Sequence, residues 1–234
     1  MRRRDRPVDV ALLGAGLRGF YAYGAWALQH PEQLRFVAVA EPDPERRVRF
    51  AEAHGIPRER QFASWEDLLA HGRLAPALLN ATMDTLHTAP TLAALDAGYH
   101  VLLEKPMALT VREVRAMVRR AAERERRLML CHVLRYAPFF RRVHDIVRSG
   151  RLGEIVTVEH RENVAYWHMA HSFVRGNWRN TEVAAPMILA KCCHDLDLLV
   201  WNLGRQCARV ASFGRLTHFR PDKIPYKPSG AVPT

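Results

Sequence analysis

Residues 8–19 read VDVALLGAGLRG, and this stretch decides the fold. Its first six residues are nearly all apolar, as expected of a strand that is covered on both faces. Gly14, Gly16 and Gly19 follow with the spacing G-x-G-x-x-G, and residues 17–29 then show a helical pattern. Gly14 allows a tight turn, Gly16 lets a pyrophosphate approach the backbone, and Gly19 packs helix on strand. This order predicts a dinucleotide-binding turn, with the phosphates at the helix N-terminus. The alternative is a tight turn that binds no ligand.

Short apolar runs and helical patterns alternate as far as residue 132. Parallel strands need a helical crossover, and both faces of their sheet are then covered. We therefore predict an α/β fold whose N-terminal part is a Rossmann unit, a doubly wound parallel sheet. Ser64 is expected to cap the helix WEDLLA, and Thr110 with Glu113 predicts a capping box. The expected strands are 8–13, 35–40, 77–81, 100–103 and 128–132, and the expected helices are 17–29, 44–53, 65–70, 88–97 and an arginine-rich helix that begins after Thr110.

The pattern changes after residue 133. Residues 154–162 alternate apolar and polar side chains, which suits an antiparallel strand with one wetter face. A helix is expected over 136–149, a polar aromatic loop over 166–185, a helix over 186–203 and a strand over 208–213. Two strands and one helix are too little to close a core. We therefore divide the chain into a dinucleotide-binding domain, 1–133, and an incomplete C-terminal α+β domain with a mostly antiparallel sheet, 134–234.

The composition is that of a globular protein. The chain has 234 residues, of which 48% are hydrophobic and 25% charged, which excludes disorder, collagen and a disulfide mini-protein. The formal charge is +11, and a strongly basic chain raises the question of nucleic-acid binding. The arginines are scattered, however, and only residues 112–127 are dense in them. We interpret that stretch as the solvated face of a helix and expect no nucleic-acid partner.

The four cysteines, Cys131, Cys192, Cys193 and Cys207, have neither zinc-site spacing nor the pattern of a disulfide framework. Free thiols suit a reducing compartment, so we expect a cytoplasmic protein. The basic and then apolar start resembles a signal peptide, but Asp9 interrupts the apolar run, so we expect a buried strand and no cleaved leader. No stretch approaches the about 20 apolar residues of a membrane span, and we expect no membrane partner.

Glu41 ends the second expected strand. An acid at this position of a dinucleotide-binding unit is expected to bind the ribose hydroxyls of the adenosine. Glu41 favours NAD over NADP because a carboxylate repels a 2′-phosphate. Arg46 and Arg47 are close enough in the sequence to leave NADP open.

Glu104, Lys105 and Pro106 follow the strand HVLL directly. Ligands of open α/β sheets bind at the carboxyl ends of the strands. A lysine there can hydrogen-bond a substrate hydroxyl or relay a proton, and the X-Pro bond can be cis. The alternative for Lys105 is a surface lysine at a strand end.

The stretch MILAKCCHDLDLL, residues 187–199, gathers several chemically active side chains. In a helix, His194 shares a face with Leu198, and Lys191 shares one with Asp195. Asp197 lies near the face of His194, and a histidine can take a proton from a hydroxyl near neutral pH. Adjacent cysteine, histidine and aspartate side chains point apart on a helix, so we expect no metal site. The alternative for His194 is a helix-capping or core histidine.

These motifs together resemble the Gfo/Idh/MocA family of NAD(P)-dependent oxidoreductases. The resemblance rests on GAGLRG, AEPDPERR, NATMDTLH and DAGYHVLLEKPMALT, and a branch of the family is similar to HSFVRGNWRN and MILAKCCHDLDLL. It runs from Val8 to Leu203. It implies a Rossmann domain followed by an α/β domain on a large open, mostly antiparallel sheet. It also implies redox chemistry on sugars, inositols and related polyols, while some members are glycosidases that use NAD in a redox cycle.

The resemblance also implies roles for particular residues. Lys105 and His194 match the active-site lysine and histidine, although Met83 stands where proline is usual and Ala190 where the histidine's aspartate is expected. Either Lys191 or Asp197 compensates for Ala190, or the catalytic arrangement differs. The implied cofactor contacts are Gly14, Gly16, Leu17, Arg18, Gly19, Glu41, Thr82, His87, Glu104, Lys105 and Pro106. The candidate substrate contacts are Arg135, Trp178, Arg179, Lys191 and Asp197, with Tyr136 and His168 as further candidates.

The predicted reaction is hydride transfer between a nicotinamide and a sugar, inositol or related polyol. His194 accepts the hydroxyl proton, and Lys105 orients that oxygen and stabilises its developing charge. The alternatives are an NAD-retaining glycosidase and a non-catalytic NAD-binding chain. Family members continue past residue 234, so the resemblance implies a C-terminally truncated chain that would be a homo-oligomer if full-length. We expect an exposed sheet edge and apolar patch after residue 150.

Overall fold

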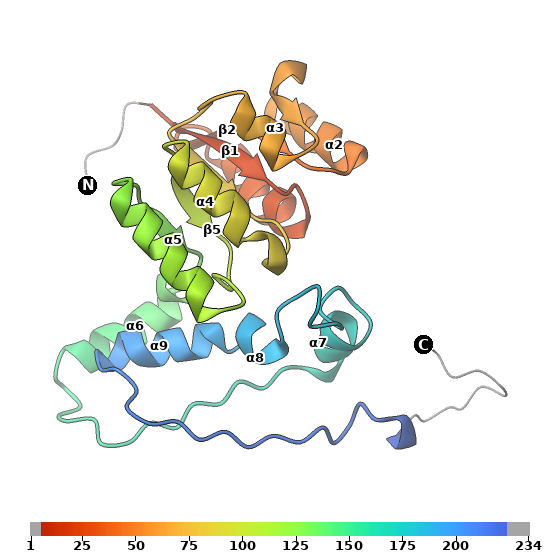
Figure 1. The fold of residues 1–234 in the computed structure, drawn as a ribbon. Coiled ribbons are helices and arrows are strands. Elements are labelled where there is room, and N and C mark those ends of the chain that lie inside the picture. Colours follow the sequence, from red (N-terminus) through yellow and green to blue (C-terminus); the bar gives the residue numbers. More distant parts are fainter. Residues whose placement is uncertain (1–5, 224–234) are drawn as a thin grey trace.

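The computed structural model describes residues 6–223 and is built around one six-stranded sheet (Figure 1). All strand pairs are parallel, and the strand order is β3-β2-β1-β4-β5-β6. The strands are β1 (Val8–Leu13), β2 (Leu34–Ala40), β3 (Gln61–Phe62), β4 (Ala77–Asn80), β5 (His100–Leu103) and β6 (Leu128–Leu130). This order, with β1 at the centre and crossovers on both sides, confirms the predicted doubly wound Rossmann sheet.

Helices cover both faces of the sheet and bury two apolar clusters. One cluster includes Leu13, Leu78 and Met117, and the other includes Leu12 and Phe50, so neighbouring residues of β1 serve opposite faces. The helices of this part are η1 (Leu17–Gly24), α1 (Ala25–Gln29), α2 (Pro44–His54), η2 (Arg58–Arg60), α3 (Trp65–Ala70), η3 (Asp84–Leu86), α4 (Thr88–Asp96) and α5 (Val111–Glu123). The first predicted helix, 17–29, therefore forms, with its first turns wound as a π-helix.

The predicted helix starts are confirmed at the level of single hydrogen bonds. The Ser64 hydroxyl accepts the N–H of Asp67 at 3.1 Å. Thr110 and Glu113 form the reciprocal capping box that begins α5. Each cap satisfies backbone donors that a helix N-terminus leaves without an intrahelical partner, which is why the sequence positions these helices accurately.

The part after β6 is helical and irregular. It contains η4 (Val133–Tyr136), α6 (Pro138–Arg148), α7 (Tyr166–Met169), η5 (Ala170–Val174), α8 (Met187–Ala190), α9 (Cys193–Leu203) and η6 (Pro221–Lys223). Figure 1 shows α6 and α9 side by side below the sheet, and the two helices are in contact. The helix predicted over 136–149 is therefore confirmed as α6, while part of the predicted 166–185 loop is helical.

Two predicted strands of this part are wrong. Residues 154–162 and 208–213 are irregular extended segments, seen as long traces in Figure 1. Within the described residues, neither segment makes a backbone hydrogen bond to another strand. Alternation of apolar and polar residues is a property of one segment, whereas a strand also needs a partner backbone. The predicted C-terminal sheet is therefore not formed among these residues. Apolar side chains after residue 150 are exposed, as predicted, with Val156 87% and Phe213 97% exposed.

The predicted helix 186–203 is also corrected, because it is broken at Lys191 and Cys192. α8 ends before this pair and α9 begins after it, and the His194 N–H donates to the Lys191 carbonyl at 3.1 Å in a three-residue turn. The i, i+4 relation expected between Lys191 and Asp195 therefore does not apply. The break turns Lys191 toward the first part of the chain.

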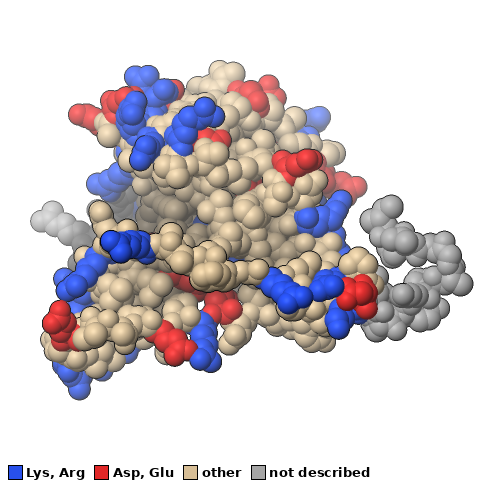
Figure 2. Space-filling view, turned by 60° about the horizontal axis from the view of Figure 1, so that its bottom comes forward, with Lys and Arg blue, Asp and Glu red and all other residues tan. Residues whose placement is uncertain are grey.

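Charges of both signs are mixed over the surface. Figure 2 shows blue and red groups separated by uncharged surface on the face that it presents. On the arginine-rich helix α5, Arg120 and Arg124 both pair with Asp96 of α4. Within residues 6–223, no helix is both long enough and apolar enough to cross a membrane.

Candidate active site

The glycine-rich turn lies at the carboxyl edge of the sheet and is closely packed on one side. Gly14 has a φ of +86°, and a Cβ there would lie 2.8 Å from the Ala81 carbonyl oxygen. A Cβ on Gly19 would lie 2.0 Å from the Gly14 carbonyl oxygen. A Cβ on Gly16 would meet no atom within 4 Å. Gly14 and Gly19 are thus required for packing, while the space beside Gly16 is open, as a diphosphate approaching the backbone needs.

Glu41 holds this turn through its carboxylate. The side chain is buried, and its two oxygens accept the N–H groups of Ala15 at 2.8 Å and Asp43 at 3.1 Å. A carboxylate has about four acceptor positions, so two remain for other donors. Arg46 pairs with Asp43, and the Arg47 guanidinium donates to the Glu41 and Pro42 carbonyls. Arg46 and Arg47, which had left binding of NADP possible, therefore both bind groups of the turn after β2.

A hydrogen-bond network that the sequence did not reveal joins the glycine-rich turn to the Glu104-Lys105-Pro106 turn. The buried Glu104 carboxylate accepts Arg18 Nε at 2.8 Å, the Tyr23 hydroxyl at 2.7 Å and the Lys105 N–H at 3.1 Å. The Tyr23 hydroxyl also lies 2.9 Å from Cys131 Sγ. Burial raises the pKa of the Cys131 thiol to about 12, so it stays protonated at neutral pH. The two turns thus lie at one edge of the sheet and are held together directly.

Lys105 follows β5 and reaches across to the second part of the chain. Its peptide bond to Pro106 is cis, and its ammonium donates to the Ala190 carbonyl at 3.2 Å. Lys191 follows Ala190 in the chain. Burial, and then repulsion from Lys105, lowers the pKa of Lys191. The two lysines border a small cavity of about 90 Å³. The structure therefore brings the candidate substrate contact Lys191 to the same cavity as Lys105.

His87 does not line the open edge, which corrects its predicted contact with a cofactor. Its side chain is fully buried, with Nδ1 2.6 Å from the Pro106 carbonyl and Nε2 3.2 Å from the Thr82 carbonyl. The Thr82 hydroxyl donates to Asn80 at the end of β4. His87 therefore supports the Pro106 turn from behind. Its spacing from Thr82 predicted proximity to the site, but not which side of the loop the ring would occupy.

His194 lies beside a second histidine that the sequence did not single out. Its ring contacts that of His132, with centroids 5.9 Å apart, and His132 Nδ1 lies 2.8 Å from Asp197. Burial, Lys105 and His132 lower the pKa of His194. Its buried Nδ1 has no hydrogen-bond partner among the described residues. His132 lies two residues after β6, at the end of the predicted strand 128–132, and this place at the carboxyl edge was the available signal.

Two substrate candidates are instead paired with each other. Arg135 donates to both oxygens of Asp197, at 2.7 and 2.6 Å. With His132 on the same carboxylate, Asp197 has an arginine and a histidine as partners. The ion pair holds α9 against η4, and part of the Arg135 side chain stays exposed.

Trp178 and Arg179 also have other contacts. Trp178 Nε1 donates to the buried Asp84 carboxylate at 2.9 Å, and the same oxygen accepts the Ala185 N–H at 2.9 Å. Asp84, in η3, thus fixes the 166–185 segment to the first part of the chain, a role that the sequence analysis missed. Arg179 is exposed and donates to the Gly176 carbonyl at 3.3 Å. The indole nitrogen of Trp178 therefore has a protein partner, while the residue borders the small cavity beside Lys105 and Lys191.

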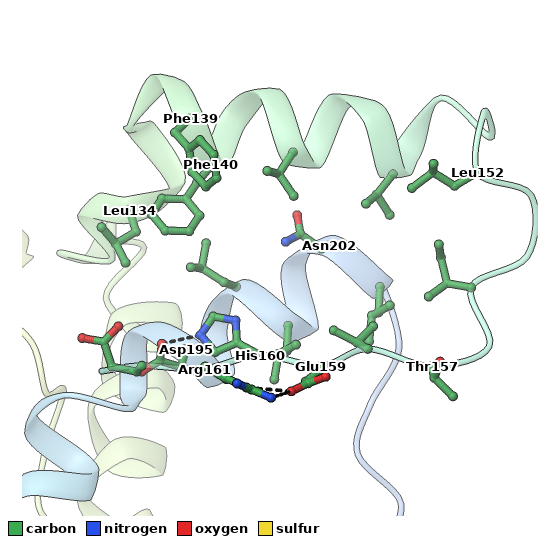
Figure 3. Close-up of a pocket in the computed structure, with 18 residues that line it drawn as sticks. Leu134, Phe139, Phe140, Leu152, Thr157, Glu159, His160, Arg161, Asp195 and Asn202 are labelled. Carbon is green, nitrogen blue, oxygen red and sulfur yellow. Dashed lines mark hydrogen bonds and ion pairs between the residues drawn. The ribbon is translucent and has the colours of Figure 1, made fainter. Parts of the chain in front are cut away.

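A larger cavity, of about 540 Å³, lies away from these residues (Figure 3). It is bordered by α6, α9 and the extended segment after Leu152, and aliphatic side chains with Phe139 and Phe140 supply most of its wall. His160 and Asp195, 2.6 Å apart, close one end. It contains neither the glycine-rich turn nor Lys105, so its size does not make it the reaction site.

Comparisons with known proteins agree with this arrangement. Residues 8–132 match the family described as "Oxidoreductase family, NAD-binding Rossmann fold", and residues 140–230 match "GFO/IDH/MocA C-terminal domain". A 1,5-anhydro-D-fructose reductase of Ensifer adhaerens is 33% identical over 178 residues, which are 75% of this chain and 51% of that protein. A trans-1,2-dihydrobenzene-1,2-diol dehydrogenase of Bos taurus is 34% identical over 57% of this chain and 40% of that protein.

Solved structures share the fold. The WlbA dehydrogenase from Bordetella pertussis, in complex with NADH and UDP-GlcNAcA, is 27% identical with a TM-score of 0.68, over 85% of this chain and 59% of that one. A myo-inositol 2-dehydrogenase from Lactobacillus plantarum is 20% identical with a TM-score of 0.71, over 85% of this chain and 57% of that one. This chain spans between a third and about half of the length of these curated relatives and of a putative oxidoreductase of Bacillus subtilis.

Proposed function

Because the chain belongs to the Gfo/Idh/MocA oxidoreductase family, we propose that it transfers hydride between a bound nicotinamide dinucleotide and a sugar, inositol or related polyol. One observation carries the proposal. The open space beside Gly16 and the amine of Lys105 share one edge of the sheet, and the Arg18–Glu104 ion pair holds the two turns together. We also propose that residues 1–133 bind the dinucleotide and that residues 134–234 complete the substrate side.

The residues present fit the dinucleotide. Gly16 leaves room for the diphosphate, and the first N–H groups of η1 lack intrahelical acceptors and favour its charge. Glu41 keeps acceptor capacity for ribose hydroxyls, and the engagement of Arg46 and Arg47 in the turn after β2 favours NAD over NADP. When bound, the nicotinamide supplies the hydride chemistry, and the protein supplies orientation.

We assign His194 as the group that accepts the proton of the substrate hydroxyl. Its pKa lies below the ordinary histidine value, so the ring is neutral near pH 7 and can accept a proton. Because Nδ1 is buried, Nε2 is the nitrogen assigned to the exchange. Lys105 keeps one N–H on the Ala190 carbonyl and has two further donors to orient the reacting oxygen and stabilise its negative charge.

A cofactor titration with a glycine variant tests the dinucleotide site. Gly16→Ala adds a methyl group to the open space, and a φ of −74° is one that alanine adopts without strain. We expect unchanged thermal stability and at least a tenfold loss of NADH affinity, measured by NADH fluorescence. The matched control is Gly214→Ala, at another glycine with no atom near its added Cβ and no left-handed φ. Equal NADH affinity of the wild type and Gly16→Ala would contradict the proposed site.

Turnover is then measured on a sugar and polyol panel at NADH absorbance. Lys105→Met should abolish turnover while leaving NADH binding nearly intact, because Lys105 acts on the substrate oxygen. Release of product without net NADH formation indicates the glycosidase alternative. NADH binding without activity on any panel member indicates the non-catalytic alternative.

A further inference from the structure

The small cavity beside Lys105 is lined by several basic side chains. Its space of about 90 Å³ lies between the Lys105 turn, the η5 segment and the break between α8 and α9. Lys105 and Lys191 border it together with His168, Ser172, Phe173, Trp178 and Ala190. Three basic side chains therefore border a cavity to which no acidic side chain contributes.

The two lysines have no carboxylate partner among the described residues. Neither ammonium forms an ion pair with a carboxylate of residues 6–223. Glu162 attracts Lys191 from an exposed position but forms no ion pair with it. Burial first, and then repulsion from Lys105, lowers the pKa of Lys191, and Lys191 in turn contributes to lowering the pKa of His168. Positive charge is therefore in excess here, and an anion would relieve the repulsion.

The size of the cavity limits the anionic group. The cavity of about 90 Å³ has room for a group of a few heavy atoms. A carboxylate has three heavy atoms and fits this space. The carboxylate would be carried by a larger molecule that extends along the sheet edge.

We propose that Lys191, with Lys105, binds a carboxylate of the substrate in this cavity, so that the substrate is an acidic sugar or another hydroxy acid. The inference rests on the proposed oxidoreductase function and narrows its substrate class. Lys191 supplies the ion pair, and the Ser172 hydroxyl and His168 border the same space as further hydrogen-bonding groups. Lys105 then acts on two neighbouring oxygens, the carboxylate and the reacting hydroxyl.

Calorimetric titration tests this inference without requiring turnover. The chain, saturated with NADH, is titrated with D-glucuronate and with D-glucose, which differ only in the carboxylate. We expect glucuronate to bind at least about tenfold more tightly, as a charge-assisted hydrogen bond predicts. Lys191→Gln should remove this preference and Lys191→Arg should retain most of it. Lys223→Gln, at an exposed lysine outside the cavity, is the matched control and should leave the preference unchanged.

A further titration with L-lactate separates the two sources of carboxylate. Binding of glucuronate without lactate identifies a sugar acid, and binding of both identifies a broader class of hydroxy acids. Equal affinity for glucuronate and glucose, or an unchanged preference in a folded Lys191→Gln variant, would overturn the inference. Because NADH binding is measured separately, a wild-type chain that binds NADH but shows no preference for glucuronate over glucose refutes the inference and leaves the proposed function standing.

Discussion

Tyr23→Phe isolates the hydroxyl that joins the two turns of the site. The Tyr23 hydroxyl lies 2.7 Å from the Glu104 carboxylate and 2.9 Å from Cys131 Sγ. It carries a single proton, and the charged carboxylate is the stronger acceptor, so we assign the proton to Glu104. Phenylalanine keeps the ring and removes only this donor. Glu104, which is 4% exposed, would retain Arg18 and the Lys105 N–H.

The expected cost follows from the charge and burial of the acceptor. A hydrogen bond to a charged group contributes about 1.5–3 kcal/mol, and water cannot replace it at a buried carboxylate. We therefore expect the free energy of unfolding to fall by about 2 kcal/mol. In a chain of this length about 1 kcal/mol corresponds to a Tm change of about 2–4 °C, so the Tm should fall by about 4–8 °C.

Urea denaturation, followed by circular dichroism, measures this difference. Tyr21→Phe is the matched control, because Tyr21 lies two residues earlier in η1 and is 57% exposed. The control should change the free energy of unfolding by less than about 0.5 kcal/mol. If Tyr23→Phe and Tyr21→Phe are equally stable, the hydroxyl does not hold the two turns together, and the argument for a coupled site is refuted.

Three further predictions concern stability. Gly19→Ala should lower the free energy of unfolding by more than about 3 kcal/mol in urea, because its Cβ would lie 2.0 Å from a carbonyl oxygen of the glycine-rich turn; a mild effect would mean that the turn relaxes. Thr110→Ala removes the capping box of α5 and should cost about 1 kcal/mol, visible as a lower Tm by calorimetry, whereas an unchanged Tm would show that the cap adds nothing. Burial lowers the pKa values of His54, His132 and His194, so the unfolded state binds more protons once the pH falls below its histidine pKa near 6.5. Because of these histidines, the free energy of unfolding should fall between pH 7 and pH 5. His54→Phe should make that fall smaller, as measured by denaturation at the two pH values. An equal or larger fall in His54→Phe would contradict the assignment.

The strength of the sequence prediction differs between the two parts of the chain. In the first part, Gly14 is required by a positive φ, and Ser64 and Thr110 are required by nearby N–H groups, so short-range physics leaves a signal in the sequence. After residue 150, the 154–162 pattern had the period of a strand, but no backbone of residues 6–223 pairs with it. Pairing is a property of two segments, and one segment's pattern cannot report it.

The candidate site shows the same division. The sequence identified Lys105 as a catalytic candidate and Lys191 as a candidate substrate contact. It could not show that, with a break after α8, both lysines border one cavity. It placed Asp197 near His194, whereas the folded chain pairs Asp197 with Arg135. The competition between partners for one carboxylate depends on distances that arise only after helices pack.

The sequence by itself determined the parallel sheet, its glycine-rich turn and the lysine at its carboxyl edge, because each depends on contacts between residues close along the chain or on a repeating pattern. Only the tertiary structure decided that Glu104 would join the two turns, that His87 would lie behind them, and that two ammonium groups would border a cavity to which no acidic side chain of residues 6–223 contributes. Those outcomes depend on burial and on which groups from distant segments meet, and neither quantity is contained in local sequence order.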